Sequence, residues 1–415
     1  MIVIKGGKKL KGQIEVSGAK NSVQFLIASA LLTEETIYLK RVPLIQDVYI
    51  LNEILIYLNC QVELDTKKNL KICTRNFENN LPDMLLSKLR SSLLFIPGLL
   101  HKYKQIQIPF PGGDRIGSRP LDTHFYILHQ FGATIRSTSK GYEISRENLH
   151  ACDIELPFPS FTGTGIAIMM AAKIPQKTIL HNVAIEPELL DLIKFLRIMG
   201  VEIEQIEKRS LKITGLKKLK GASFTVMPDR LEIGTLLIAA MATKGQITFY
   251  KQELLYLDSL CHILKLSGCA FKEIDNKIVV KYINPLIAQD VETGIYPNFP
   301  TDLQPQLVAL MTQLIGNSTL KENLYDDRFS YVKDLKRMGA NIEIVNSNVY
   351  IMGGTELKGN EVEATDIRGG AALIIAGLLA NGRTIIKGEY HIERGYDNIY
   401  EKLRSLGADI NKIDK

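Results

Sequence analysis

The chain has no long apolar run, few cysteines and no large excess of charge of one sign. No apolar stretch approaches the roughly 18 residues of a membrane-spanning helix, and the start MIVIKGGKKL lacks the apolar core of a signal peptide. The net charge of +6 is scattered, and the lysine-rich patches KLKGQ and GLKKLKG are typical of solvated strand edges. No aromatic-and-basic stacking pattern indicates nucleic acid as a partner. We expect a soluble, cytoplasmic globular protein that binds neither membrane nor nucleic acid.

Cysteine and histidine are also too sparse to indicate a metal centre. The five cysteines are odd in number and lie mostly in apolar surroundings, which indicates reduced, buried thiols. Neither the cysteines nor the seven histidines have the spacing of metal ligands. We therefore expect no metal and no cofactor.

What the sequence does contain is a repeat. Six stretches of the chain have the pattern of an amphipathic helix that stops at a small or turn-forming residue. A short strand-like run of alternating apolar and polar residues then begins, as in EPELLDLIKFLRIMGVEI and GYDNIYEKLRSLGADI. The six stop residues are Asn59, Gly132, Gly200, Gly268, Gly339 and Gly407. The intervals between them are 73, 68, 68, 71 and 68 residues, so the chain consists of six copies of one unit. A unit of this size is longer than an ordinary solenoid repeat of roughly 20–50 residues, which predicts two compact groups of three copies.

Each copy also carries a helix that is apolar all round, as in SFTGTGIAIMMAAK and DIRGGAALIIAGLLA, and such a helix is buried. The unit therefore consists of a buried helix, a strand, an amphipathic helix and a strand pair. The last copy ends at DINKIDK without the second strand that the other copies have. The first residues of the chain, IKGGKKLKGQIEV, resemble that part of the other copies, which indicates that the missing strand lies at the front of the chain. The chain also exceeds the roughly 250–300 residues of a single core. We predict an α/β protein of two domains, residues 20–227 and, discontinuously, 1–19 with 228–415.

Polar and charged residues interrupt the apolar pattern at the starts of the six buried helices. They are Lys20 and Asn21, Arg90, Ser160 with Thr162, Asp229 with Arg230, Asp302, and Asp366 with Arg368. Helix capping accounts for about half of them, and Asp302 is either such a cap or a general base. Capping does not account for the cations, which are unfavourable beside the positive end of a helix dipole unless they hold an anion. We predict that these positions converge on a site for a multiply phosphorylated small molecule.

Two further segments carry candidate residues. The loop PFPGGDRIGSRP, residues 109–120, places Asp114, Arg115 and Arg119 among glycines and prolines. It is either an ordinary turn or a lid over an anionic substrate. Arg394 lies in YHIERGYDNI, a segment that on its own indicates only surface charge at the start of a helix.

Eight motifs, in order along the whole chain, resemble the UDP-N-acetylglucosamine 1-carboxyvinyltransferases, a family of enolpyruvyl transferases. They are SGAKNS, LRSSL, PGGDRIGSRPLDTH, PDRLEIGT, FPTDLQPQ, DDRFSYVKDLKRMGA, ATDIRGGAAL and YHIERGYDNI. The resemblance implies two inside-out α/β domains hinged around a deep cleft, each with three βαβαββ units and the helices in the middle. It implies transfer of the enolpyruvyl group of phosphoenolpyruvate to the 3-hydroxyl of UDP-N-acetylglucosamine through a tetrahedral adduct, with release of phosphate. It also implies a cytoplasmic step of peptidoglycan synthesis and cell wall biogenesis, a part in cell shape and cell division, and no obligate protein partner.

The same resemblance implies roles for individual residues. Those implied to hold phosphoenolpyruvate are Lys20, Arg119 and Arg394, helped by Arg90 and Arg368. Asn21 and Asp302 would contact the reacting sugar hydroxyl, with Asp302 as the general base. The residues implied to clasp the uridine diphosphate are Arg119, Pro120, Leu121, Asp122, His124, Ser160, Thr162 and Gly163, with Tyr325 and Asp326 near the diphosphate and sugar.

The chain departs from the family in two motifs. Where the family loop has a cysteine, the general acid and the target of fosfomycin, this chain has Asp114. An aspartate donates a proton only if its pKa rises well above about 3.9, through desolvation or neighbouring anions. We predict an active enzyme that resists fosfomycin, because a carboxylate is a poor nucleophile toward its epoxide. At SFTGTG, where the family has SVGAT, either Ser160 or Thr162 is the predicted contact of the diphosphate.

Two other functions stay open. The transferase that acts on shikimate 3-phosphate shares the fold and the donor, although PGGDRIGSRPLDTH and YHIERGY are typical of the sugar-nucleotide branch. A non-catalytic binder of nucleotide sugar, its cysteine lost, is the second alternative. The retained residues that argue against such decay are Lys20, Asn21, Arg119, Asp302, Arg368 and Arg394.

Overall fold

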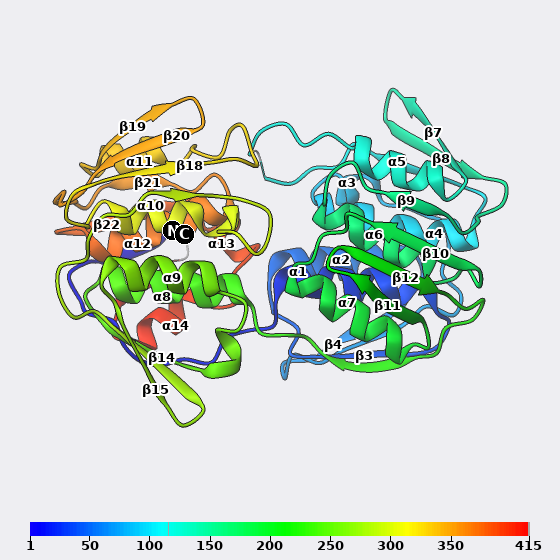
Figure 1. Cartoon of the computed structure of the whole chain (residues 1–415), viewed down its shortest axis with the longest axis horizontal. Coiled ribbons are helices and arrows are strands. Elements are labelled where there is room, and N and C mark those ends of the chain that lie inside the picture. Colours follow the sequence, from blue (N-terminus) through cyan, green and yellow to red (C-terminus); the bar gives the residue numbers. More distant parts are fainter. Residues whose placement is uncertain (115, 414–415) are drawn as a thin grey trace. The chain divides into compact units, whose positions relative to one another are not determined.

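The computed structural model describes residues 1–114 and 116–413, and its contacts divide the chain into two compact units (Figure 1). Unit 1 comprises Met1–Ser17, Asp114–Arg119 and Pro228–Lys415, and unit 2 comprises Gly18–Gly113 and Pro120–Met227. The segment Asp114–Arg119 was expected in the first domain, but by its contacts it groups with unit 1. Arg115, a predicted lid residue, lies outside the described residues.

Unit 1 consists of three four-stranded sheets and a group of central helices. The sheet orders are β21-β22-β1-β23, β15-β16-β14-β2 and β17-β18-β20-β19. The strands are β1 (Ile2–Lys5), β2 (Lys11–Gln13), β14 (Gln246–Tyr250), β15 (Ala270–Ile274), β16 (Lys277–Lys281), β17 (Val291–Glu292), β18 (Asn317–Lys321), β19 (Asn341–Val345), β20 (Asn348–Met352), β21 (Glu361–Glu363), β22 (Arg383–Lys387) and β23 (Asp409–Lys412). The central helices, which pack against one another, are α8 (Arg230–Ala242), α10 (Gln304–Met311) and α12 (Ile367–Leu379). The remaining helices are α9 (Asp258–Ser267), α11 (Val332–Arg337), α13 (Glu389–Glu393) and α14 (Ile399–Ser405).

Unit 2 repeats this plan. Its sheet orders are β13-β3-β5-β4, β11-β12-β10-β9 and β6-β8-β7. The strands are β3 (Ile37–Lys40), β4 (Gln61–Leu64), β5 (Leu70–Cys73), β6 (Gln105–Pro109), β7 (Ala133–Thr138), β8 (Gly141–Arg146), β9 (Asp153–Glu155), β10 (Lys177–His181), β11 (Glu202–Glu207), β12 (Ser210–Thr214) and β13 (Ala222–Thr225). The apolar helices are α1 (Lys20–Ser29), α6 (Phe161–Ala171) and the pair formed by the 3-10 helix η2 (Arg90–Phe95) and α4 (Ile96–Lys102). The other helices are α2 (Gln46–Tyr57), α3 (Asp83–Leu86), α5 (Asp122–Gln130) and α7 (Pro187–Ile198).

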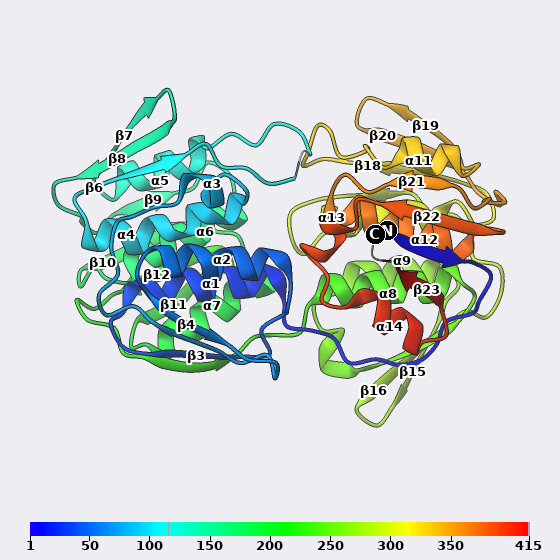
Figure 2. The same cartoon turned by 180° about the vertical axis from the view of Figure 1, so that it is seen from behind.

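The four strands of each four-stranded sheet, together with two helices, form one βαβαββ unit. In the sheet that contains β14, for example, β14 pairs parallel with β2 and antiparallel with β16. β1 pairs with both β22 and β23, so the first residues complete the last copy, as the sequence predicted. The pairing brings the amino nitrogen of Met1 to 2.9 Å from the carbonyl oxygen of Ile413, so the first residues lie beside the last strand, β23 (Figure 2).

The second copy differs from the βαβαββ unit that the family resemblance implies, because its sheet has three strands rather than four among the described residues. The residues ahead of its buried helix form only the short helix α3, and Pro82 immediately precedes that helix. Proline cannot donate a hydrogen bond to a strand ladder, which disfavours a first strand at this place.

The six predicted stop residues share one backbone conformation. All have a positive φ, from 62° at Asn59 to 109° at Gly268. This left-handed conformation ends a helix and redirects the chain, and glycine and asparagine adopt it with the least strain. The regular spacing in the sequence therefore marks the turn that joins each amphipathic helix to its strand pair.

The central helices are buried on all sides, as the sequence predicted. In α8 every residue from Arg230 to Ala242 is buried, and the two units have separate hydrophobic cores.

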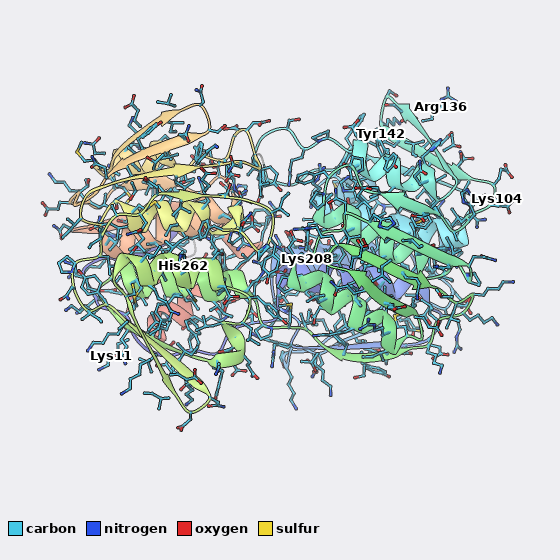
Figure 3. The ribbon with its side chains drawn as sticks, in the orientation of Figure 1. Lys11, Lys104, Arg136, Tyr142, Lys208 and His262 are labelled. Atoms are coloured by element: carbon cyan, nitrogen blue, oxygen red, sulfur yellow. The ribbon has the colours of Figure 1, made fainter. Side chains whose placement is uncertain are left out.

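None of the helices in residues 1–114 and 116–413 is long and apolar enough to cross a membrane. The basic side chains of Lys11, Lys104 and Arg136 are exposed at strands or strand ends (Figure 3).

The five cysteines are free thiols. Burial raises the pKa of Cys60, Cys152 and Cys269 to about 12 and that of Cys261 to about 11. At neutral pH these four side chains are therefore thiols and not thiolates. Within the described part of the chain, no group of three or more His, Cys, Asp or Glu side chains could hold a metal ion.

Candidate functional site

In unit 1, two buried arginines grip the carboxylate of Asp302. Asp302 lies in the short 3-10 turn Thr301–Leu303 ahead of α10. Arg328 donates from Nη2 to Asp302 Oδ1 at 2.7 Å, and Arg368 donates from Nη2 to Asp302 Oδ2 at 3.3 Å. The two arginine side chains are 3% and 5% exposed, whereas that of Asp302 is 28% exposed. The carboxylate is therefore fixed from the buried side and open on the other.

The start of α12 places Arg368 beside Asp302. Asp366 precedes this helix, and its Oδ1 accepts hydrogen bonds from the backbone nitrogens of Arg368 at 3.0 Å and Gly369 at 2.9 Å. Asp229 caps α8 in the same way. The capping interpretation is confirmed at both aspartates, and it explains why an arginine directly inside each helix has a defined position. In α8 that arginine, Arg230, lies over the ring of Tyr296, 5.4 Å from its centroid.

The loop segment of unit 1 adds two more arginines. Arg394, the residue that ends α13, donates from Nη1 to Asp114 Oδ1 at 2.5 Å, and Arg119 donates from Nη2 to the carbonyl oxygen of Asp114 at 2.9 Å. Gly117, with φ 105°, packs so closely on the next loop that an added Cβ would lie 2.9 Å from the nitrogen of Asp327 and 3.0 Å from that of Asp326. A glycine at this position is what allows the segment to lie against residues 326–327.

Positive charge exceeds negative charge in this cluster. Burial lowers the pKa of Arg119, which also interacts electrostatically with Tyr325, Asp114, Arg328 and Asp302, so the loop and the Asp302 pair form one group. Buried guanidinium groups are costly unless anions neutralise them. In this cluster two carboxylates, Asp114 and Asp302, face three buried guanidinium groups and the partly buried one of Arg119. Arg328 Nε and Arg368 Nη1 have no hydrogen-bond partner among the described residues. The arrangement is suited to binding a small molecule with more than one acid group.

Unit 2 carries a second charged group at the start of α1. Lys20 is the first residue of this helix, and its Nζ lies 2.7 Å from Asp47 Oδ2. Both residues are buried, at 7% and 3% exposure, and the adjacent Asn21 is half-buried. A lysine held this way by a carboxylate has a fixed position at the positive end of a helix, where an incoming anion would meet it.

The starts of η2, α5 and α6 form the rest of the unit 2 site. Arg90 donates from Nη2 to the carbonyl oxygen of Pro120 at 3.2 Å, and His124 Nε2 lies 2.7 Å from Thr162 Oγ1. Ser160 caps α6, since its Oγ accepts from the nitrogen of Gly163 at 3.2 Å. Of the residues between Pro120 and His124, Leu121 is buried and Asp122, the first residue of α5, is exposed.

His124 is uncharged at neutral pH. Burial, together with the nearby charge of Arg90, lowers its pKa to about 4. The His124 side chain can therefore form hydrogen bonds to a ligand without adding a positive charge beside that of Arg90. Its second ring nitrogen, Nδ1, is buried with no partner among the described residues.

Comparison with known proteins identifies the family. The chain is 40% identical over 411 residues to UDP-N-acetylglucosamine 1-carboxyvinyltransferase 1 of Caldanaerobacter subterraneus subsp. tengcongensis, with 98% of each chain covered. It is 38% identical over 418 residues to the UDP-N-acetylglucosamine 1-carboxyvinyltransferase of Magnetococcus marinus, with 100% of this chain and 99% of the relative covered. The chain belongs to the UDP-N-acetylglucosamine 1-carboxyvinyltransferase family. The broader family model of EPSP synthase (3-phosphoshikimate 1-carboxyvinyltransferase) matches residues 4–403.

Solved structures agree on the fold of this carboxyvinyltransferase family member. The enolpyruvyl transferase NikO from Streptomyces tendae matches with a TM-score of 0.89 at 23% identity, and covers 99% of this chain and 98% of its own. EPSP synthase from Acinetobacter baumannii matches with a TM-score of 0.75 at 17% identity, over 99% of this chain and 98% of its own. The predicted enolpyruvyl transferase fold of two inside-out α/β domains is confirmed.

The predicted site residues of this family member fall into two groups. Unit 1 holds Asp114, Arg119, Asp302, Tyr325, Asp326, Arg368 and Arg394. Unit 2 holds Lys20, Asn21, Arg90, Pro120, Leu121, Asp122, His124, Ser160, Thr162 and Gly163. In unit 1 the four residues Asp114, Arg119, Asp302 and Arg368 belong to the cluster described above, and Arg394 joins it through Asp114. In unit 2 Arg90, His124 and Thr162 are linked through the 120–124 segment.

Two residues that form ion pairs with predicted site residues of this family member were not predicted from the sequence. Arg328 is buried against Asp302, and the ring of Tyr325 lies 5.6 Å from its guanidinium carbon. It is part of the motif DDRFSYVKDLKRMGA, but nothing in that motif indicates a partner 26 residues earlier. Asp47 forms the ion pair with Lys20. In the sequence it is an acidic residue in the first turn of a helix, which is common and does not indicate a site.

Proposed function

We propose that the chain transfers the enolpyruvyl group of phosphoenolpyruvate to the 3-hydroxyl of UDP-N-acetylglucosamine, with release of phosphate, as a step of peptidoglycan precursor synthesis. The observation that carries this proposal is the full-length identity of 37–40% to relatives named for this activity. The excess of buried positive charge around Asp302 supports it, because the donor carries both a phosphate and a carboxylate.

The reaction needs cations for the donor, a base for the sugar hydroxyl and an acid for the donor's C3. We assign the donor's anionic groups to Arg119, Arg368 and Arg394, with Lys20 as a further cation. Arginine suits this role because its planar fork binds carboxylate or phosphate through two parallel hydrogen bonds. We assign the role of base to Asp302, since two arginines orient its carboxylate and one side of it is open.

Asp114 is proposed as the acid, in the place where the family has a cysteine. In the structure its carboxylate accepts a hydrogen bond from Arg394, and an ionised carboxylate can only accept. Catalysis then requires that an anionic group of the donor take over Arg394. The released Asp114 would lie beside a negative charge, which favours its protonated form. Binding of the donor to Arg394 would therefore also favour protonation of Asp114, the proposed acid.

The residues of unit 2 are proposed to bind the nucleotide and the sugar. Helix starts at α5 and α6 offer backbone nitrogens and the hydroxyls of Ser160 and Thr162 to a diphosphate. Arg90 and the 120–124 segment supply a cation and a neutral histidine beside them. Asn21 and, from unit 1, Tyr325 and Asp326 are proposed contacts of the sugar. A location in the cytoplasm and effects on cell shape and division stay predictions.

One assay tests the proposal. Purified protein should release phosphate when it is mixed with UDP-N-acetylglucosamine and phosphoenolpyruvate, and fosfomycin should not inhibit it. The variant Asp114→Cys should remain active and become sensitive to fosfomycin, because a thiolate opens the epoxide and a carboxylate does not. Phosphate release with shikimate 3-phosphate instead would support the alternative acceptor. Binding of the nucleotide sugar with no phosphate release would support a non-catalytic binder.

A further inference from the structure

Three side chains next to Asp302 and Arg368 form a buried hydrogen-bonded group. They come from three places in unit 1, namely Thr235 in α8, Gln306 in α10 and Tyr396 between α13 and α14. Thr235 Oγ1 lies 2.9 Å from the hydroxyl of Tyr396, and Gln306 Nε2 lies 3.1 Å from Thr235 Oγ1 and 3.0 Å from that same hydroxyl. Their exposures are 4%, 0% and 2%, so no bulk water competes for these bonds.

The hydroxyl of Thr235 also reaches the backbone. It donates its only hydrogen to the carbonyl oxygen of Leu231 at 2.8 Å. With that hydrogen used, the bond between Thr235 and Tyr396 is one in which the tyrosine hydroxyl donates.

Both members of the arginine–aspartate pair touch this group. Gln306 Nε2 also lies 3.0 Å from the carbonyl oxygen of Asp302, so its two hydrogens are shared among three acceptors, one of which is the backbone of Asp302. The guanidinium carbon of Arg368 lies 5.2 Å from the centroid of the Tyr396 ring. Burial lowers the pKa of Arg368, but Tyr396, Asp302 and Asp229 raise it by more, so the net shift is upward and the side chain stays charged.

We propose that Tyr396, together with Gln306 and Thr235, is a positioning group that directs Arg368 toward the anionic donor and holds Asp302 in place as the base. The inference rests on the proposed function, which assigns an anionic group of the donor to Arg368 and the role of base to Asp302. Tyr396 acts through Arg368, against which its ring is packed, and Gln306 acts through the backbone of Asp302. A displacement of about 1 Å at such residues is enough to cost up to about 100-fold in rate.

Two single variants and their combination test this positioning role. Tyr396→Phe removes the hydroxyl and keeps the ring, and Thr235→Val removes its acceptor with little change of shape. Each should raise KM for phosphoenolpyruvate about 10-fold and leave KM for UDP-N-acetylglucosamine within about twofold of wild type. The double variant should be no worse than either single variant, because both break the same chain of bonds.

Tyr400→Phe is the matched control. Tyr400 is 6% exposed, and its hydroxyl is buried with no partner among the described residues, so its removal should change neither KM. Calorimetric binding of phosphoenolpyruvate in the same variants should weaken by a similar factor, a readout that does not depend on turnover. Wild-type binding and KM in both single variants would overturn the inference. So would an equal rise of both KM values together with a lowered Tm, which would indicate a structural role only. Absence of turnover in the wild-type protein would instead contradict the proposed function.

Discussion

At the scale of single residues, Asp114 is the proposed acid, at the position where the family resemblance implies a cysteine. The segment Asp114–Arg119 is held in unit 1 by Arg394, by the bond from Arg119 and by the close packing of Gly117. A cysteine thiol at the same position could not form an ion pair of this kind unless it were deprotonated. The aspartate therefore links the state of the acid to the occupancy of Arg394.

Asp114→Asn separates this acid role from folding. The amide keeps the shape of the carboxyl group but cannot donate the proton that C3 requires. We expect kcat to fall by about 10²–10⁴-fold, the usual contribution of a general acid, with Tm within a few degrees of wild type. Phosphate release under saturating substrates measures kcat. Asp275→Asn, at an exposed turn of unit 1 with φ 54°, is the matched control, and asparagine tolerates that conformation. Full turnover in Asp114→Asn would remove Asp114 as the acid.

At the scale of elements, the helix caps determine where the charged side chains stand. Asp366 and Asp229 each accept two backbone hydrogen bonds at the start of a central helix, and an arginine lies one or two residues further on. The cap fixes the first turn, and the first turn fixes the arginine. A buried helix end with no cap would leave its backbone nitrogens unsatisfied.

The cap of α12 can be tested directly. Asp366→Ala should lower the free energy of unfolding by about 1–2 kcal/mol, because two backbone nitrogens lose their acceptor in a buried setting. Asp366→Ser should recover most of that loss, since serine is also a good cap. Urea unfolding of the three proteins measures the difference. Equal stability of the alanine and serine variants would show that the cap does not hold the helix.

At the scale of the whole molecule, the two units respond to pH through different buried groups. In unit 2, burial lowers the pKa of His101 and of His124 to about 4. The unfolded side chains have a pKa of about 6.5, so the folded state excludes a proton that the unfolded state binds. The stability contributed by these histidines is present above about pH 6.5 and is lost as pH falls toward 4. In unit 1, burial raises the pKa of Glu232 to about 7, which gives the opposite trend between about pH 4.5 and 7.

His101→Gln should reduce the pH dependence of stability. His101 lies outside the proposed site, and its Nε2 is 2.8 Å from the carbonyl oxygen of Met170. Between pH 7 and pH 5 the wild-type protein should lose about 2 kcal/mol more of its free energy of unfolding than the variant, from this histidine alone. His262→Gln, an exposed residue on α9, should leave the pH dependence unchanged (Figure 3). Identical slopes for the wild-type protein and His101→Gln would contradict the assignment of a neutral, buried histidine.

Periodicity was enough to predict the repeat, the buried helices and the displaced strand β1. Each of these depends on local signals: apolar runs, left-handed stop residues such as Gly339, and strand-like segments. The site was predicted only in part. Arg328 and Asp47 are ordinary charged residues in the sequence, and their importance appears when the fold brings Arg328 to Asp302 and Asp47 to Lys20. Such pairs are not encoded in any spacing along the chain.

The missing first strand of the second copy shows another limit. The family resemblance implied four strands in each unit, but a proline and the short helix α3 occupy the place of the first one. A regular interval fixes the helices and the turns, because these recur with the same residues. It does not fix an edge strand, which one copy can lose without exposing the core.

The protonation states of the thiols have a consequence for tolerance of oxidants. Peroxide attacks thiolates, and four of the five cysteines are held as thiols by burial. The loop 109–120 contains no cysteine, and the proposed acid Asp114 is a carboxylate, which cannot become a sulfenic acid. Turnover should then persist after peroxide treatment that silences members of the family with a catalytic cysteine, and comparison of the wild-type protein with Asp114→Cys under peroxide would measure that advantage.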